Sequence, residues 1–288
     1  MQPQYRDRGL HHRSRARHRQ CGARRANHRG RRRRRGPSGA SPAARDRISE
    51  VARARARLIA FALAAAASWA AVPARAETVD VALVLALDSS SSVDRDEYFL
   101  QSQGIAAAFA DAEVQAAIAA GPNKVIAVAV LEWSQPGRAR VDLGWQKVTA
   151  ETAPAFAEAI FNNPRYIEGG GTGVGTALFR AGALMDQVPF QPLRRVIDLS
   201  GDGKNSAGPP AAPVRDALVA RGITVNGLAV VNAEADVDDY YRAEVIGGPG
   251  AFVEVARDYE DFVNAIKRKL LRELKTEALV ATLTPARP

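Results

Sequence analysis

The feature that most constrains the fold is an apolar run at positions 79–87, which reads VDVALVLAL and contains a single charged residue. A strand with one face in water alternates apolar and polar residues, whereas a strand covered on both faces is apolar almost throughout. Strands of the second kind occur in sheets that have helices packed on each face. The chain must therefore supply amphipathic helices for two faces of a sheet.

Apolar runs and helical stretches alternate along the rest of the chain, which is typical of an α/β fold. We expect strands at 79–87, 124–133, 139–145, 194–200, 223–231 and 250–255, and helices at 94–120, 149–162, 175–188, 210–222 and 258–274. The segment SQPGR leaves room only for a tight turn between the second and third strands, so these two should be antiparallel. The sequence predicts an α/β fold with a doubly wound, mostly parallel six-stranded sheet, one antiparallel edge strand and helices on both faces.

The basic residues are concentrated in the N-terminal quarter, although the whole chain has a formal net charge of +9. Residues 1–76 contain 20 Arg and 3 acidic residues, whereas residues 77–288 contain 20 Lys and Arg and 28 Asp and Glu. A domain that binds nucleic acid carries a basic face. The acidic balance of residues 77–288 therefore argues against nucleic acid as a partner.

All four histidines and the only cysteine also lie in the N-terminal quarter. Residues 77–288 therefore cannot form a Ser-His-Asp triad, a Cys nucleophile, a His/Cys zinc site or a disulfide. A metal site in this region must use oxygen ligands, which suit Mg²⁺, Mn²⁺ or Ca²⁺.

Residues 51–76 have the pattern of a signal peptide. RARAR at 53–57 precedes an apolar run of about fifteen residues and the small-residue cleavage pattern Ala74-Arg75-Ala76. The run is shorter than the roughly twenty residues of a spanning helix, so an uncut membrane anchor is the weaker alternative. We expect cleavage after Ala76, no membrane span afterwards, and a periplasmic or secreted product.

Residues 1–50 contain almost no large apolar side chains and cannot bury a core. They form either a disordered basic arm or a region before the true start, which a GTG codon at Val51 would provide. We expect one folded domain at 77–275, whose family resemblance is described below, and a loose C-terminal tail at 276–288.

Polar oxygen-bearing residues follow two of the expected strands. Asp88, Ser90 and Ser92 come after the first strand, and Asp202 lies in SGDG after the fourth. Alternate residues of an extended segment project to one side, so the first three can face a common point. Taken alone, each segment is an ordinary polar turn. If the strand order is 3-2-1-4-5-6, however, the two loops converge at the carboxyl edge of the sheet.

A glycine-rich loop, EGGGTGVGTAL at 168–178, places Thr172 just before a helix. A phosphate-binding loop is the rival interpretation. The P-loop requires a lysine that this segment lacks, and a dinucleotide-binding loop should follow the first strand directly. Thr172 is therefore a third candidate ligand.

Together these segments resemble the von Willebrand factor type A superfamily and its metal-ion-dependent adhesion site, and in particular secreted bacterial members of it. The family pattern is D-x-S-x-S, a Thr in a Gly-rich loop, and an Asp before Gly after the fourth strand. The matching residues are Asp88, Ser90, Ser92, Thr172 and Asp202. The resemblance implies Mg²⁺, or alternatively Mn²⁺ or Ca²⁺, held by the three hydroxyls, with the two carboxylates acting largely through waters. The extra Gly201 departs from the family pattern and puts the position of Asp202 in doubt.

Three functions compete for this site. The resemblance implies a protein-binding module, not an enzyme, in which a partner donates an acidic side chain to the metal. A metal-assisted hydrolase would need a carboxylate base such as Glu168 or Asp202. A small-molecule binding protein of the periplasm would need two lobes and a longer chain.

Two charged features lie outside the proposed site. Asp198 interrupts an apolar strand and is either a hydrogen-bonded core carboxylate or a support for the metal ligands. Lys267, Arg268, Lys269 and Arg272 lie near the end of the last expected helix, where we expect a solvated basic face.

Overall fold

A computed structural model describes residues 76–232 and 234–275 of the chain. The predictions made for residues 1–75 and 276–288 concern segments outside this part. None of the helices within the described ranges is long and apolar enough to cross a membrane.

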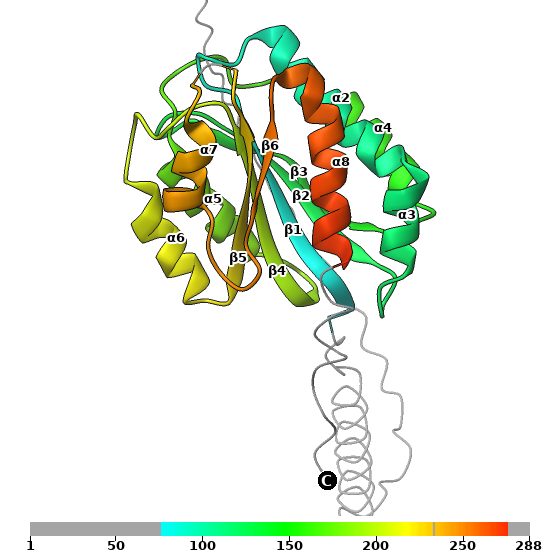
Figure 1. Ribbon diagram of the computed structural model, residues 1–288. Coiled ribbons are helices and arrows are strands. Elements are labelled where there is room, and N and C mark those ends of the chain that lie inside the picture. Colours follow the sequence, from blue (N-terminus) through cyan, green and yellow to red (C-terminus); the bar gives the residue numbers. More distant parts are fainter. Residues whose placement is uncertain (1–75, 233, 276–288) are drawn as a thin grey trace, which may run out of the picture. The chain divides into compact units, whose positions relative to one another are not determined.

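The described residues form a six-stranded sheet of order β3-β2-β1-β4-β5-β6 (Figure 1). The strands are β1 (Thr78–Asp88), β2 (Ile126–Trp133), β3 (Ala139–Val148), β4 (Gln191–Gly201), β5 (Ile223–Val230) and β6 (Val253–Ala256). β2 and β3 pair antiparallel, and every other neighbouring pair is parallel. The predicted fold class is confirmed, and β1 and β4 lie side by side.

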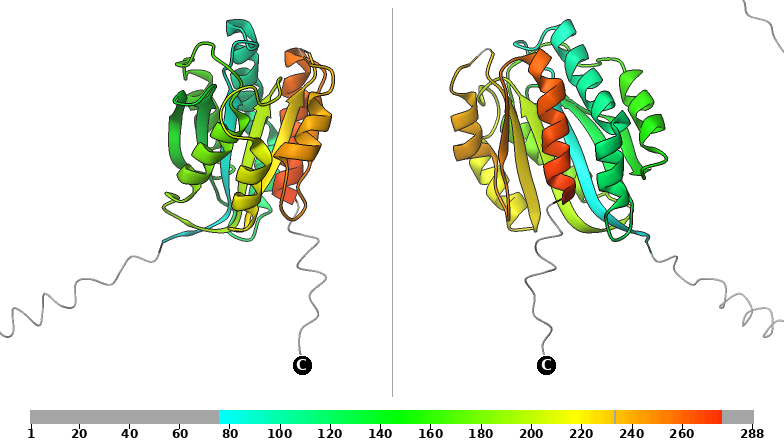
Figure 2. Two further views of the ribbon diagram at one scale, coloured as in Figure 1. Left: turned by 90° about the vertical axis from the view of Figure 1, so that its left-hand side faces the viewer. Right: turned by 45° about the vertical axis from the view of Figure 1, so that its right-hand side comes forward.

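Helices cover both faces of the sheet (Figure 2). They are α2 (Arg95–Ala110), α3 (Ala112–Ala119), α4 (Ala153–Phe161), α5 (Val174–Met185), α6 (Ala211–Val219), α7 (Val237–Tyr240), the π-helix η1 (Tyr241–Val245) and α8 (Tyr259–Lys275). Leu83 and Leu85 of β1 pack in a cluster with α2, α3, α4 and α8, while Ala82 and Val84 pack in a second cluster with α5, α6 and α7. This division explains why β1 is apolar at successive positions.

The helix expected at 94–120 is two helices. Asp111 has an extended backbone (φ −74°, ψ 134°), and its side chain accepts a hydrogen bond from the backbone N–H of Glu113. Asp111 therefore ends α2 and caps α3, as short polar side chains do at helix starts. The capping box predicted at Asp94 and Glu97 is present at the start of α2.

The segment α7–η1 was not predicted from the sequence. It spans only two short turns of different helical pitch, so it gives too little periodicity to detect. This segment carries Tyr241, which is fully buried and lies beside the candidate site described next.

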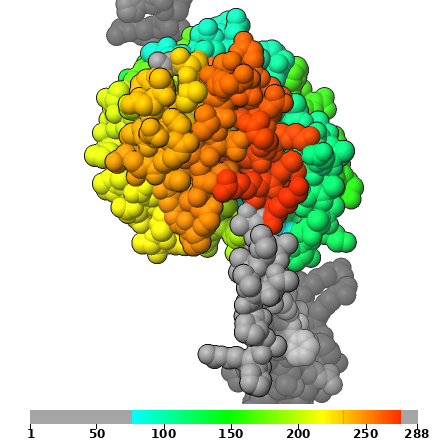
Figure 3. Space-filling view, in the orientation of Figure 1, coloured from blue at the N-terminus to red at the C-terminus, as the bar shows by residue number. Residues whose placement is uncertain are grey.

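The expectation for Lys269 was wrong. The outer side of α8 is part of the molecular surface (Figure 3), but Lys269 has no exposed area. Its Nζ lies 2.8 Å from Asp198 Oδ1 and 2.6 Å from Glu273 Oε1. A buried ammonium needs charged partners, and the unpredicted partner was Asp198 on β4, 71 positions earlier in the chain. Asp198 is thus a core carboxylate that faces α8.

Candidate metal site

The site begins where β1 ends. β1 pairs with β2 up to Asp88 and with β4 up to Leu87, so Asp88 is held by regular strands on both sides. Its side chain is fully buried, and Oδ1 accepts a 2.8 Å hydrogen bond from the backbone N–H of Ser90. Gln101 of α2 donates to the Asp88 carbonyl oxygen at 3.1 Å. The chain therefore turns at Asp88 with a fixed carboxylate.

The loop after β1 meets the loop after β4, as the sequence predicts. Ser90 Oγ and Ser92 Oγ are 3.2 Å apart, and Ser92 Oγ donates to Asp202 Oδ1 at 2.6 Å. Three of the predicted site residues are thus joined by direct contacts across segments 110 positions apart. The convergence follows from the adjacency of β1 and β4.

Thr172 lies in the same cleft. The cleft has a volume of about 480 Å³, and its lining includes Ser92, Thr172, Asp202, Gly203 and Glu234. The Thr172 backbone is tied to the loop after β4, because its N–H donates to Ser206 Oγ at 2.9 Å and its carbonyl accepts from the Ser206 N–H at 2.8 Å. Of the five predicted residues, Ser92, Thr172 and Asp202 line the cleft. Ser90 contacts Ser92, and Asp88 accepts from the Ser90 N–H, so these two lie directly behind it.

Burial perturbs both carboxylates of the site. It raises the pKa of Asp88 to about 7; the hydrogen bond from the Ser90 N–H opposes this rise and the negative charge of Asp202 adds to it. Burial also raises the pKa of Asp202, against the hydrogen bond from Ser92. A nearby divalent cation would offset both effects, since it favours the charged forms.

The oxygen atoms of the site fit a hard cation. Asp88 Oδ2 and Asp202 Oδ2 are buried and accept no hydrogen bond from any described residue. No group of three or more His, Cys, Asp or Glu side chains in the described ranges is placed to hold a metal. A cation here would therefore rely on Ser and Thr hydroxyls beside two carboxylates, a set that suits Mg²⁺, Mn²⁺ or Ca²⁺.

Gly201 explains how the departure from the family pattern is accommodated. A Cβ at this position would lie 2.7 Å from Asp88 Oδ2 and 2.8 Å from the Tyr241 hydroxyl. No side chain fits in that space, so glycine permits the close approach of β4 to Asp88. Asp202 still accepts the Ser92 hydroxyl, so the extra glycine does not separate Asp202 from the loop after β1.

Two residues that the sequence analysis missed hold the loops of the site in place. The first is Glu132 on β2, which is fully buried and accepts from Ser89 Oγ at 2.7 Å, Tyr166 N at 3.0 Å and Ile167 N at 2.9 Å. A carboxylate inside the apolar run VIAVAVLEW was the available sequence signal for it.

The second is Arg165, which links the same loops. Its guanidinium donates to Ser89 Oγ and the carbonyls of Ser89, Val93, Asp94 and Ile167 at 2.7–3.0 Å. No sequence pattern distinguishes this arginine from exposed ones, because its acceptors are mostly backbone carbonyls. Together, Glu132 and Arg165 fix the loop that carries Ser90 and Ser92.

Glu168 does not join the site. Its carboxylate pairs with Arg95 at 3.0 Å, the side chain is 67% exposed, and it is not among the residues that line the cleft. The hydrolase alternative thereby loses one of its two candidate bases.

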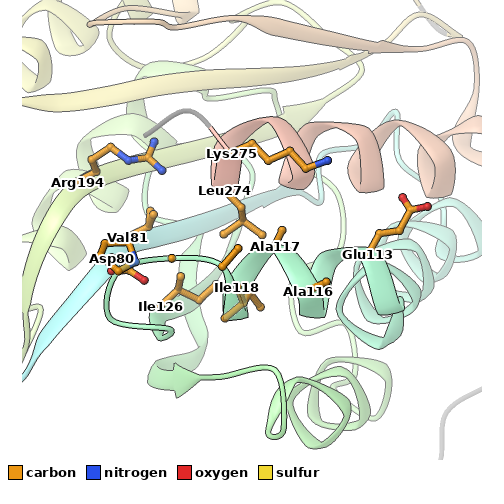
Figure 4. A pocket seen from close by; sticks show the side chains of 13 residues that line it. Asp80, Val81, Glu113, Ala116, Ala117, Ile118, Ile126, Arg194, Leu274 and Lys275 are labelled. Atoms are coloured by element: carbon orange, nitrogen blue, oxygen red, sulfur yellow. The ribbon is translucent and has the colours of Figure 1, made fainter. Parts of the chain in front are cut away.

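A larger cavity, of about 820 Å³, lies elsewhere (Figure 4). Its lining includes Asp80, Val81, Ile118 and Leu274, which come from β1, α3 and α8. Asp80 is eight residues before Asp88 on β1, and a strand rises about 3.3 Å per residue. This cavity therefore lies at the amino-terminal end of β1, whereas the candidate site lies at its carboxyl end. It shares no residue with the metal site.

Comparisons with solved structures return several proteins at low sequence identity. A von Willebrand factor type A protein from Catenulispora acidiphila is 17% identical, with 68% of this chain and 43% of that chain covered and a TM-score of 0.48. Proximal thread matrix protein 1 from the mussel byssus, with a zinc-occupied MIDAS motif, is 17% identical over 69% and 46% of the two chains, with a TM-score of 0.47. The conserved hypothetical protein BatB from Bacteroides thetaiotaomicron is 16% identical over 68% and 100%, with a TM-score of 0.42.

The chain spans less than half the length of the first two of these structures. No curated protein matches it. The strand order and the helices on both faces are those of a von Willebrand factor type A-like fold. One family model matches residues 78–278, nearly the whole of the described sheet and helices, and its description is "Protein of unknown function (DUF1194)". The chain therefore belongs to the DUF1194 family.

Proposed function

We propose that this protein binds a divalent cation and recognises a protein partner through it, outside the cytoplasm. The residues that would hold the cation are Asp88, Ser90, Ser92, Thr172 and Asp202. Mg²⁺ is the expected ion, with Mn²⁺ and Ca²⁺ as alternatives. The observation that carries the proposal is the direct contact of Ser92 with Asp202 in a cleft that Thr172 also lines.

The charge of the donor set favours an acidic partner. Three neutral hydroxyls leave only two carboxylates to balance a doubly charged ion, and Mg²⁺ seeks six oxygen ligands. When bound, such an ion supplies a positive centre for an incoming carboxylate. An Asp or Glu side chain would complete both charge and coordination, in a contact stronger than one between neutral groups. Ser92 is exposed, so the cleft is open to such a side chain.

We propose recognition and not hydrolysis for this site. A hydrolase needs a base free to take a proton from water. Glu168 is paired with Arg95, and Asp202 accepts the Ser92 hydroxyl. Glu168 does not line the cleft, and Asp202, which does, would face the cation as one of its ligands.

The test is capture of the partner with and without the metal. The full-length protein, immobilised in Mg²⁺, should retain a partner from an extract of the source cell envelope, and chelator should release it. Thr172→Ala should lose the partner, because it removes one ligand on a loop outside the core. Thr224→Ala, a substitution at the start of β5 and away from the carboxyl edge of the sheet, is the matched control. A partner retained equally by Thr172→Ala and in chelator would contradict metal-dependent recognition.

A further inference from the structure

Tyr241 lies directly behind the anchor carboxylate of the site. It opens the π-helix η1, which packs on the same face as α5 and α6, and its side chain is fully buried. Its hydroxyl makes no hydrogen bond with any residue in the described ranges. Buried tyrosine hydroxyls usually find a partner, so this hydroxyl needs an explanation.

Two glycines make room for the tyrosine to reach the site. A Cβ at Gly227 of β5 would lie 2.6 Å from Tyr241 Cδ1, and a Cβ at Gly201 of β4 would lie 2.8 Å from its hydroxyl. Any larger residue at either position would displace the ring. The Tyr241 ring therefore packs on β5 at Gly227, and its hydroxyl lies beside Gly201 at the end of β4.

The hydroxyl ends next to the one oxygen of Asp88 that lacks a donor. The same Cβ position at Gly201 is 2.7 Å from Asp88 Oδ2, so the two atoms flank one point. Oδ1 is already satisfied by the Ser90 N–H, whereas Oδ2 accepts no hydrogen bond from the described residues. A buried donor without an acceptor and a buried acceptor without a donor each cost free energy. The two oxygens do not hydrogen-bond to each other directly. Because they lie 2.7 Å and 2.8 Å from one point, they are at most about 5.5 Å apart, a separation that one bridging water can span.

We propose that Tyr241 is a positioning residue of the candidate metal site, whose hydroxyl donates to the inner oxygen of Asp88 through one bridging water. This inference rests on the proposed cation site. This contact fixes the orientation of the carboxylate, as outer groups do for metal ligands in general. A π-helix is a common device for placing a side chain at a functional site, and η1 begins with this residue.

A purely structural tyrosine would behave differently. A core role depends on the ring, which fills the space over Gly227, and not on the hydroxyl. Tyr241→Phe keeps the ring and removes one oxygen. If the hydroxyl had no acceptor, this change would leave the cation affinity unaltered and the apoprotein as stable or more stable. The affinity for the cation therefore separates the two roles.

The experiment measures the Mn²⁺ dissociation constant of the full-length protein by calorimetry, with Mn²⁺ alone as the probe. Tyr241→Phe should bind Mn²⁺ about tenfold more weakly, the scale of outer-shell substitutions at metal sites, with a melting temperature without metal near that of the wild type. Tyr240→Phe, at the half-buried neighbouring tyrosine, should bind as the wild type does. Equal affinity of Tyr241→Phe and the wild type would overturn the positioning role alone, whereas a wild type that binds no Mn²⁺ would overturn the cation site as well.

A second readout covers the case in which Tyr241→Phe does not fold. Mn²⁺ added to the wild type should produce a tyrosine difference signal in the near ultraviolet that saturates at the same concentration as the calorimetric binding. Absence of that signal, with binding present, would contradict contact between the hydroxyl and the site.

Discussion

The single residue on which the cation site most depends is Asp88, which supplies a buried negative charge fixed by Ser90. An ion that binds only the native state adds about 2.7 kcal/mol at 100 times its dissociation constant, and roughly 2–4 °C in melting temperature per kcal/mol for a domain of this size. Asp88→Ala should remove this gain on titration with Mg²⁺, while Asp96→Ala, at an exposed site on α2, should keep it. Equal melting shifts in Asp88→Ala and the wild type would contradict the assignment.

The raised pKa of Asp88 also makes a prediction about pH. The cation binds the ionised carboxylate, and burial raises the pKa of this group to about 7. Affinity for Mn²⁺ should therefore be highest above pH 7 and decrease as the pH falls through 7, with release of protons on binding. Calorimetry at pH 6 and pH 8, in two buffers of different ionisation enthalpy, measures both effects. If the affinity for Mn²⁺ were the same at pH 6 and pH 8, Asp88 would be already ionised at pH 6 or would not contact the ion.

Among the connecting elements, the loop of residues 89–94 depends on Arg165. The planar guanidinium donates to several acceptors at once, which a lysine ammonium cannot reproduce. Arg165→Lys should thus loosen the loop and weaken Mn²⁺ binding several-fold. Arg95→Lys changes an exposed ion pair with Glu168 and should have little effect. If both variants bound Mn²⁺ as tightly as the wild type, Arg165 would not be needed to hold the loop of residues 89–94 in place.

Helix α8 is held to the sheet by Lys269, Asp198 and Glu273, which place two buried carboxylates around one ammonium. Burial raises the pKa of Asp198 to about 7, Lys269 opposes the rise, and the charge of Glu273 adds to it. Because the folded pKa exceeds the unfolded value of about 3.9, the contribution to stability is complete below about pH 4 and is lost as the pH rises through 7.

The matched variant for this element is Asp198→Asn, which has no titrating group at the position. The melting temperature of the wild type should fall relative to that of Asp198→Asn between pH 5 and pH 8, with chelator present in both samples. A difference between the two proteins that does not vary with pH would show that the proton is not held at Asp198.

For the molecule as a whole, the sequence was sufficient to predict a mostly parallel six-stranded sheet with one antiparallel edge strand. The meeting of the site loops followed on the condition that the strand order is 3-2-1-4-5-6, which is the order the structure has. The apolar run of β1 required two covered faces, and the short turn before β3 required an antiparallel edge strand. Once β1 and β4 were neighbours, Ser92 and Asp202 had to approach each other, and they are joined by a hydrogen bond.

What could not be predicted depends on contacts between distant segments. Lys269 is buried because Asp198 faces it, and nothing near either residue in the sequence indicates the pair. Likewise, the Tyr241 side chain fits beside β5 and the end of β4 only because glycines stand at Gly227 and Gly201. Patterns along the chain give the periodicity of each element but not the partners that its side chains meet.

The most direct test of the central claim is a crystal structure of the protein grown with Mn²⁺, in which anomalous scattering locates the ion. We expect one peak within coordinating distance of the Ser90, Ser92 and Thr172 hydroxyls, beside Asp88 and Asp202. Ordered protein with no peak in that cleft, or a peak only at another place on the molecule, would contradict it.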